Sequence, residues 1–126
     1  MLDKKKFYIN GQWVEPNKLN DFKVINPCNE DPCAIISLGS KEDTNTAVKS
    51  AKKAFKAWKE TTKEERLNYL EKLLSVYKKR SVEMAEAISL EMGAPMDWAT
   101  NAQTASGQSH LEDFILRLKD FEFDEH

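Results

Sequence analysis

The 126-residue sequence has few glycines, few cysteines and no long apolar run, and each scarcity excludes a class of protein. Its four glycines are not clustered, so there is no glycine-rich turn of the kind that cradles the phosphates of a nucleotide or dinucleotide. No stretch approaches the roughly 18 consecutive apolar residues of a membrane-spanning helix. The lysines at positions 4–6 are followed by no apolar segment, which is unlike a signal peptide. We therefore expect a cytoplasmic protein that does not bind a membrane.

Cysteine and histidine are too few and too scattered to predict a metal centre. Four residues separate Cys28 from Cys33, and His110 and His126 are isolated. A structural zinc site needs four well-placed ligands, which this pattern does not supply. We interpret the two cysteines as reduced thiols in a surface loop, because disulfides are rare in cytosolic proteins.

The charges are almost balanced, with 19 basic and 21 acidic residues and a formal net charge of -2. This balance gives no reason to expect a nucleic acid or an anionic membrane as a partner. Hydrophobic residues make up 40% of the sequence, which is ordinary for a globular protein of one domain.

Residues 7–38 predict two small antiparallel β-hairpins. Asn10 and Gly11 separate two apolar runs, and this dipeptide favours a type I′ turn because both residues tolerate positive φ. The second hairpin is predicted to pair residues 22–25 with residues 34–38, across a loop that contains two prolines.

Residues 41–119 predict three or four packed helices. Apolar residues at helical spacing indicate a first helix over 41–59. Ser40 and Asp43 form an imperfect capping box before it, since the strict motif has Glu or Gln at the third helical position. A full capping box begins at Thr62, and the short link before that residue predicts that the first two helices are antiparallel neighbours.

A third helix is expected to begin near Ser81, or the second helix continues past it with a bend; either ends at Gly93, which is followed closely by a proline. The last helix is expected over 97–119, although Gly107 inside it costs about 1 kcal/mol relative to alanine. The tail, 121–126, alternates aromatic and acidic residues and resembles the opening of a strand. The fold class is therefore α+β and mainly helical.

No group of residues in the sequence predicts catalysis. Cys28 and Cys33 are surrounded by acids and prolines, without a base or an oxyanion hole. Glu86 and Glu91 are five residues apart and do not share a helix face well, so we interpret them as solvated charges. His110 is interpreted as an ordinary helical histidine. We predict no catalytic, cofactor-binding or metal-binding residues.

The order of the motifs resembles the start of the aldehyde dehydrogenase superfamily. The segments that carry the resemblance are F-Y-I-N-G-Q-W-V, V-I-N-P, A-V-K-S-A-K-K-A-F-K-A-W, E-E-R-L-N-Y-L-E-K-L and L-E-M-G-A-P, and they follow the family pattern as far as Pro95. The motif E-M-G-A-P together with A-Q-x-x-x-G-x-x-H and F-E-F-D-E is similar to a bacterial subgroup of the family.

The resemblance implies a parent α/β oxidoreductase that oxidises an aldehyde to a carboxylic acid. Such enzymes use a cysteine nucleophile, a glutamate base and an oxyanion-hole asparagine, and bind NAD or NADP on a Rossmann-like sheet. In the family all of these come after the segment seen here, and neither Cys28 nor Cys33 falls at the nucleophile's position. Residues 1–126 would therefore be an N-terminal part of the coenzyme-binding domain, inactive alone and without a bound cofactor.

The resemblance also predicts self-association, because the helices would lack the protein that covers them in the family. The expected apolar face consists of Phe55, Trp58, Leu70, Leu74 and Tyr77.

The three tryptophans are expected in core or interface packing rather than on a stacking surface. Two alternatives stay open: a non-catalytic helical interaction module, and a regulatory subunit of a full-length dehydrogenase.

Overall fold

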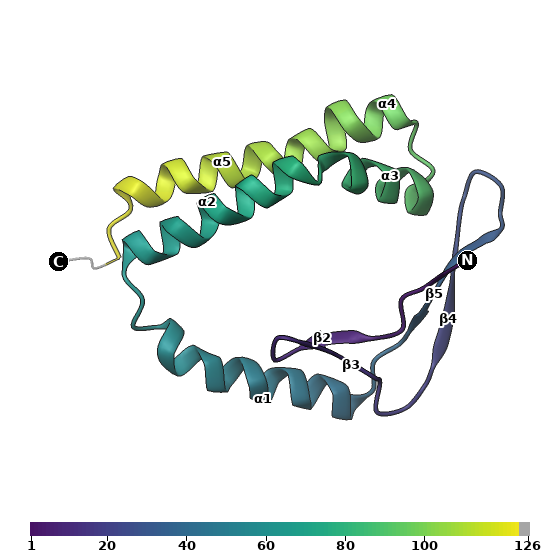
Figure 1. The fold of residues 1–126 in the computed structure, drawn as a ribbon, viewed down its shortest axis with the longest axis horizontal. Helices are drawn as coiled ribbons and strands as arrows, with labels where there is room; N and C mark the ends of the chain where they lie inside the picture. The colour runs from purple at the N-terminus through teal and green to yellow at the C-terminus, as the bar shows by residue number, and fades with distance from the viewer. Residues whose placement is uncertain (124–126) are drawn as a thin grey trace. The chain divides into compact units, whose positions relative to one another are not determined.

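A computed structural model describes residues 1–123. The chain divides into two compact units, the first Met1–Glu60 and the second beginning at Thr61. Among the described residues, the first unit holds the strands and one long helix, whereas the second is helical (Figure 1). The α+β, mainly helical fold class predicted from the sequence is confirmed.

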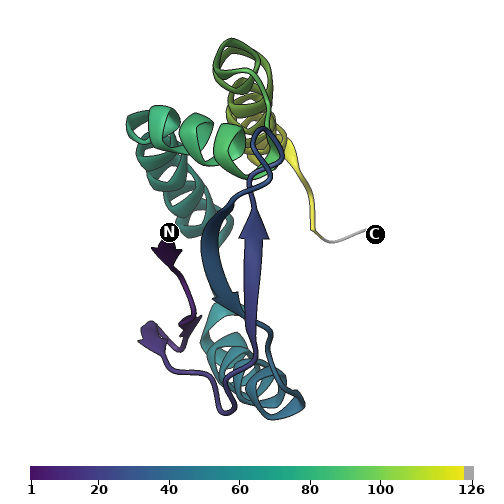
Figure 2. The same ribbon diagram turned by 90° about the vertical axis from the view of Figure 1, so that its right-hand side faces the viewer.

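The larger sheet of the first unit has the strand order β1-β5-β4. Strand β4 (Asp21–Ile25) and strand β5 (Pro32–Ser37) pair antiparallel, as predicted, and Figure 2 shows them as two opposed arrows. Strand β1 (Leu2–Asp3) pairs parallel with β5 and was not predicted. A strand of two exposed residues leaves no periodic pattern in the sequence, so only its distant partner defines it.

The second sheet is the predicted hairpin of β2 (Phe7–Ile9) and β3 (Gln12–Val14). Asn10 and Gly11 have φ values of 54° and 76°. Both values are positive, as a type I′ turn requires, so the prediction made from this dipeptide is confirmed.

Helix α1 (Lys41–Trp58) follows β5 and contacts strand β2 of the hairpin. Its capping box is complete: the Ser40 hydroxyl accepts from the Asp43 amide, and the Asp43 carboxylate accepts from the Ser40 amide. The expectation of an imperfect box was therefore wrong, because an aspartate at this position reaches the capping amide as a glutamate does.

The second unit begins with α2 (Lys63–Lys79), whose capping box at Thr62 is formed as predicted. Helix α2 packs along α5 (Ala105–Asp120), and the two run in opposite directions (Figure 1). The antiparallel neighbour of α2 within its unit is thus the last helix. The pairing of the first two helices, expected from their short link, stays a prediction, because those helices belong to different units.

Helix α3 (Ser81–Met92) ends where Gly93 takes up a left-handed conformation with φ of 70°, as predicted. Helix α4 (Met96–Trp98) leads into a π-helical turn, Ala99–Thr104, which continues as α5. The predicted last helix therefore has the right extent, but it contains a change of register. Residues 121–123 form no strand, and the rest of the strand predicted for the tail lies outside the described residues.

Few side chains are buried in either unit. The buried residues of the first unit are Ala34, Ser37 and Asp43, and those of the second are Ala85, Ala99, Thr104 and Ile115. Within residues 1–123, no large side chain is less than 2% exposed. Much apolar surface is consequently uncovered. None of the described helices combines the length and the apolar character that crossing a membrane requires.

Candidate functional site

The cysteines lie apart from any catalytic arrangement. Cys28 is exposed in the loop after β4, whereas Cys33 lies half-buried in β5 and donates a weak hydrogen bond to the Val24 carbonyl, at 3.4 Å. Neither is in a disulfide. The prediction of two reduced thiols agrees with this, but the placement of Cys33 in a surface loop was wrong, because the strand begins one residue before it.

The other polar residues considered from the sequence are not brought together. Glu86 and Glu91 are both exposed on α3, and His110 is exposed on α5. In the part of the chain that the structure describes, no three side chains of His, Cys, Asp or Glu lie close enough to hold a metal ion. His126 lies outside that part.

A buried carboxylate joins three segments of the first unit. One Asp43 oxygen accepts the backbone N–H of Asn17, at 2.8 Å, and the other accepts the backbone N–H of Ser40, also at 2.8 Å. These bonds, the one from Asn17 first, hold the pKa of Asp43 below its ordinary value. The sequence indicated only the capping role, because the contact with Asn17 spans 26 residues.

Side chains with specific contacts join α2 to α5 in the second unit. The Tyr77 hydroxyl donates to the Thr104 carbonyl at 2.9 Å. The Cα of Gly107 lies so close to this phenol that a Cβ there would overlap the hydroxyl oxygen. The Lys78 ammonium lies 2.7 Å from the Glu112 carboxylate, and its hydrogen bond is the first cause that keeps the pKa of Glu112 below its ordinary value.

The start of α2 contacts the end of α5. The Lys63 ammonium donates to the carbonyls of Lys119 and Phe121, at 3.0 and 3.3 Å. A cation at this position satisfies carbonyls that the helix leaves unpaired and favours the negative end of its dipole. The Arg66 guanidinium lies 5.3 Å from the centre of the Phe123 ring.

The π-helical turn holds two buried oxygen atoms without a hydrogen-bond partner among the described residues, Gln103 Oε1 and Thr104 Oγ1. Ala99, at the start of the turn, is fully buried, and the turn packs against α3. Single π turns within α-helices often mark functional positions. Sequence periodicity cannot reveal one inserted residue when apolar residues are sparse on both sides, so this feature was missed.

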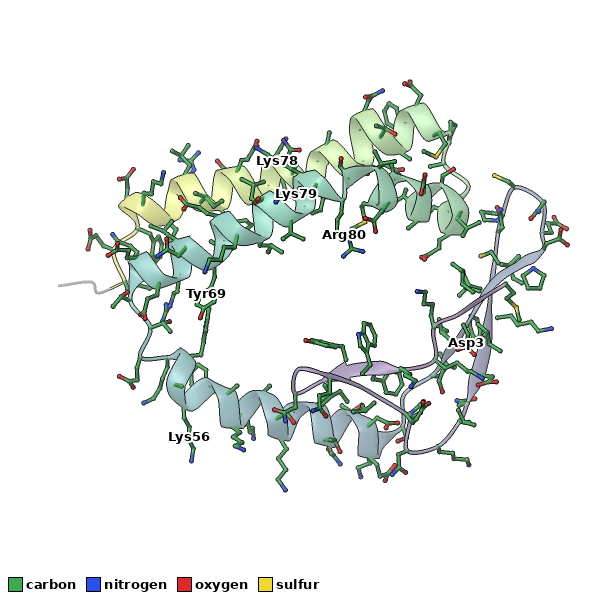
Figure 3. The ribbon with its side chains drawn as sticks, in the orientation of Figure 1. Asp3, Lys56, Tyr69, Lys78, Lys79 and Arg80 are labelled. Atoms are coloured by element: carbon green, nitrogen blue, oxygen red, sulfur yellow. The ribbon has the colours of Figure 1, made fainter. Side chains whose placement is uncertain are left out.

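An apolar groove of about 330 Å³ lies on α2 and α3. Its charged lining residues are Arg80 and Glu83, which pair at 2.9 Å. Their hydrogen bond raises the pKa of Arg80 and lowers that of Glu83. Figure 3 shows Tyr69 projecting from α2, and Arg80 from the junction of α2 and α3, on the side away from α5. The apolar lining residues are Leu73, Val76, Tyr77, Met84 and Ala87.

Core packing was the wrong expectation for the tryptophans. Trp13, Trp58 and Trp98 are 68%, 45% and 61% exposed. Trp13 contacts only one other aromatic ring among those described, that of Tyr8, at 5.3 Å between ring centres. Interface packing, the other half of the expectation, stays a prediction.

The residues of the apolar face predicted from the sequence belong to both units. Phe55 and Trp58 are exposed on α1 in the first unit. Leu70, Leu74 and Tyr77 are half-buried on α2, and their spacing places them on the face that Tyr77 directs toward α5. The uncovered residues of α2 are instead those of the groove, such as Leu73 and Val76.

Comparisons with known proteins identify one family. The family model described as "Aldehyde dehydrogenase family" matches residues 13–123. Among curated proteins, a 3-succinoylsemialdehyde-pyridine dehydrogenase from a Pseudomonas species is 39% identical over 126 residues, which is 99% of this chain and 26% of that protein. The chain thus spans about a quarter of the length of the curated relatives it matches.

Solved structures have the same fold over nearly all of the chain. An aldehyde dehydrogenase from Bartonella henselae matches with a TM-score of 0.98 and 54% identity, over 99% of this chain and 26% of that one. A variant of aldehyde dehydrogenase C from Pseudomonas syringae, solved with NAD+ and octanal, matches with a TM-score of 0.94 and 33% identity, over 97% and 25%.

Proposed function

Since the chain belongs to the aldehyde dehydrogenase family, we propose that it forms about a quarter of an oxidoreductase that converts an aldehyde to a carboxylic acid with NAD or NADP. The observation that carries this proposal is the family match over residues 13–123, at 26% of the length of the relatives. Within that enzyme, residues 1–126 form an N-terminal part of the coenzyme-binding domain. Its cytoplasmic location stays a prediction from the sequence.

The chain's own part in the reaction is structural. Its two thiols are the only nucleophiles of the kind the family uses. The Cys33 thiol already donates a hydrogen bond to the Val24 carbonyl of the neighbouring strand. A thiol nucleophile needs a neighbouring base and donors for the developing oxyanion. These groups come from the rest of the enzyme, and no residue of this chain takes a catalytic, cofactor-binding or metal-binding role.

The residues present do not fit the phosphates of a dinucleotide. A helix N-terminus binds phosphate through exposed backbone amides. At α1 and α2 one of these amides, that of Asp43 or Glu65, already donates to the side chain of Ser40 or Thr62. The carboxylates of Asp43 and Glu65 also lie at the two helix starts. A phosphate there would meet like charge, so the coenzyme is held by other parts of the protein.

The uncovered apolar surface is where the rest of the enzyme docks, and in its absence the chain associates with itself. Soluble monomers rarely expose large contiguous apolar patches. In the groove of the second unit, Leu73 and Val76 are each at least half exposed, and so is Phe55 in the first unit. Light scattering at micromolar concentration should show a dimer or a larger species. A monomer that also fails to bind a hydrophobic dye would contradict this part of the proposal.

A chimaeric enzyme tests the proposed function directly. Residues 1–126 replace the matching quarter of the Bartonella henselae enzyme, with which they share 54% identity. We expect the chimaera to reduce NAD or NADP with a panel of short and long aldehydes, and the isolated chain to show no turnover. Calorimetry should detect coenzyme binding to the chimaera alone.

Two controls separate this proposal from its alternatives. Turnover by the isolated chain that disappears in Cys28→Ser or Cys33→Ser would show that the chain carries its own nucleophile. A folded but inactive chimaera would contradict the scaffold role. If in that case the isolated chain bound an intact dehydrogenase, the subunit alternative would be supported.

A further inference from the structure

The π-helical turn Ala99–Thr104 needs an external support. Hydrogen bonds from each residue to the fifth along the chain are rare, and the α-helical pattern is normally favoured. The six residues of the turn, A-T-N-A-Q-T, include no proline that would break the α pattern. Its unusual register must therefore be held by contacts with other elements.

One such contact comes from α2. The Tyr77 hydroxyl donates to the carbonyl of Thr104, the last residue of the turn, at 2.9 Å. Thr104 is only 3% exposed, so water does not readily replace this donor. Loss of a hydrogen bond to a buried carbonyl is unfavourable, which ties the register of the turn to the position of the phenol.

Gly107 makes room for this contact. A Cβ at this position would overlap the Tyr77 hydroxyl oxygen and lie 3.0 Å from Cζ of the same ring. Real Cβ atoms do not approach so closely, and both helices are regular at this point. Glycine is unfavourable inside a helix, and the phenol gives the reason for its presence here.

We propose that Tyr77 and Gly107 form a lock that fixes the π register of the Ala99–Thr104 turn. A π turn contains one residue more than the α pattern, so its loss would rotate α4 by about 100° relative to α5. That rotation would withdraw Ala99 from its buried position beside α3. The lock therefore determines which residues of α4 and of the turn face α3.

A double-mutant cycle on the 126-residue chain tests the lock. Gly107→Ala should lower Tm by at least about 4 °C in the native background, because the new methyl group displaces the phenol. In a Tyr77→Ala background the same substitution should raise Tm by about 4 °C, since alanine favours the helix and nothing is left to clash. Ser106→Ala, at the exposed neighbouring position, should act with the same sign in both backgrounds.

Hydrogen exchange gives an independent measurement. Tyr77→Phe removes only the hydroxyl, and protection of the amides at positions 99–108 should fall about fivefold, equivalent to about 1 kcal/mol. Should the isolated chain melt without a cooperative transition, the same variants are measured in the chimaeric enzyme. A stabilising effect of Gly107→Ala in both backgrounds, or unchanged protection in Tyr77→Phe, would overturn the proposal.

Discussion

Each of the two compact units is stabilised internally by buried groups of a different kind. In the first unit, the backbone N–H of Asn20 donates to the buried Ser37 hydroxyl at 3.1 Å, and the backbone N–H of Asn17 donates to the buried Asp43 carboxylate. In the second unit, the buried apolar residues Ala85, Ala99 and Ile115 lie where helices approach one another. The first unit thus relies mainly on buried side-chain acceptors, and the second mainly on close packing between helices.

Because of this difference, different changes should destabilise the two units. A buried acceptor stabilises only while it keeps its charge and its donors, so the first unit should respond to acid and to the loss of a cap. Close-packed helices respond to changes of volume instead. Substitutions that separate these two responses test the comparison.

The largest effect is expected from Ile115→Ala, which removes the largest buried apolar side chain of the second unit. Loss of a buried isoleucine side chain costs about 2–5 kcal/mol. Urea unfolding measures the change in the free energy of unfolding. Leu116→Ala is the matched control, because Leu116 is 59% exposed and its truncation should cost about 0.5 kcal/mol or less. Equal losses in the two variants would contradict the assigned packing.

A smaller loss is expected when α3 is enlarged at its buried face. Ala85 is fully buried, so Ala85→Leu should cost about 1–3 kcal/mol through overpacking. Ala87→Leu, two residues along the same helix at an exposed position, should change stability little. Hydrogen exchange should place the Ala85→Leu effect in the second unit, with the strands of the first unit unchanged.

The two capping boxes compare the units directly. Ser40→Ala and Thr62→Ala each remove an N-cap side chain and should each cost about 1 kcal/mol. Only the first change should also expose the 15–20 segment to exchange, because Asp43 ties the cap of α1 to Asn17. Identical local effects in the two variants would remove the distinction between the units.

The smallest effect near neutral pH is that of titration. Hydrogen bonds from Asn17 and Ser40 lower the pKa of Asp43, and those from Thr62 lower the pKa of Glu65. Carboxylates with a lowered folded-state pKa stabilise the fold above their unfolded pKa, at about pH 4, and lose that contribution as the pH falls. Asp43→Asn should make the free energy of unfolding of the first unit depend less on pH in the acid range. An unchanged pH dependence would contradict the role of this carboxylate.

Local signals in the sequence predicted local structure well. Asn10 and Gly11 indicated a turn with two positive φ values, and Gly93 indicated a left-handed helix end, because few other residues adopt these conformations easily. Both features are present. The family resemblance is likewise confirmed.

Features that depend on distant partners could not be predicted in this way. Strand β1 exists only through its pairing with β5, and the packing of α2 along α5 joins two helices that are far apart in the sequence. The exposed fraction of Trp13 depends on which other segments pack against its ring, and the local sequence does not contain that information. For the lock, one signal was available: Gly107 within a predicted helix indicates close approach of another group, although it does not identify Tyr77.

Reconstitution from two pieces tests the central claim most directly. The 126-residue chain is mixed with the remaining three-quarters of the Bartonella henselae enzyme, prepared separately, and aldehyde-dependent reduction of NAD or NADP is followed. We predict that neither piece turns over alone, that the mixture does, and that Cys28→Ser and Cys33→Ser leave its rate unchanged. Turnover by the 126-residue chain alone, or full activity of the larger piece without it, would contradict a role as a non-catalytic but required part of the enzyme.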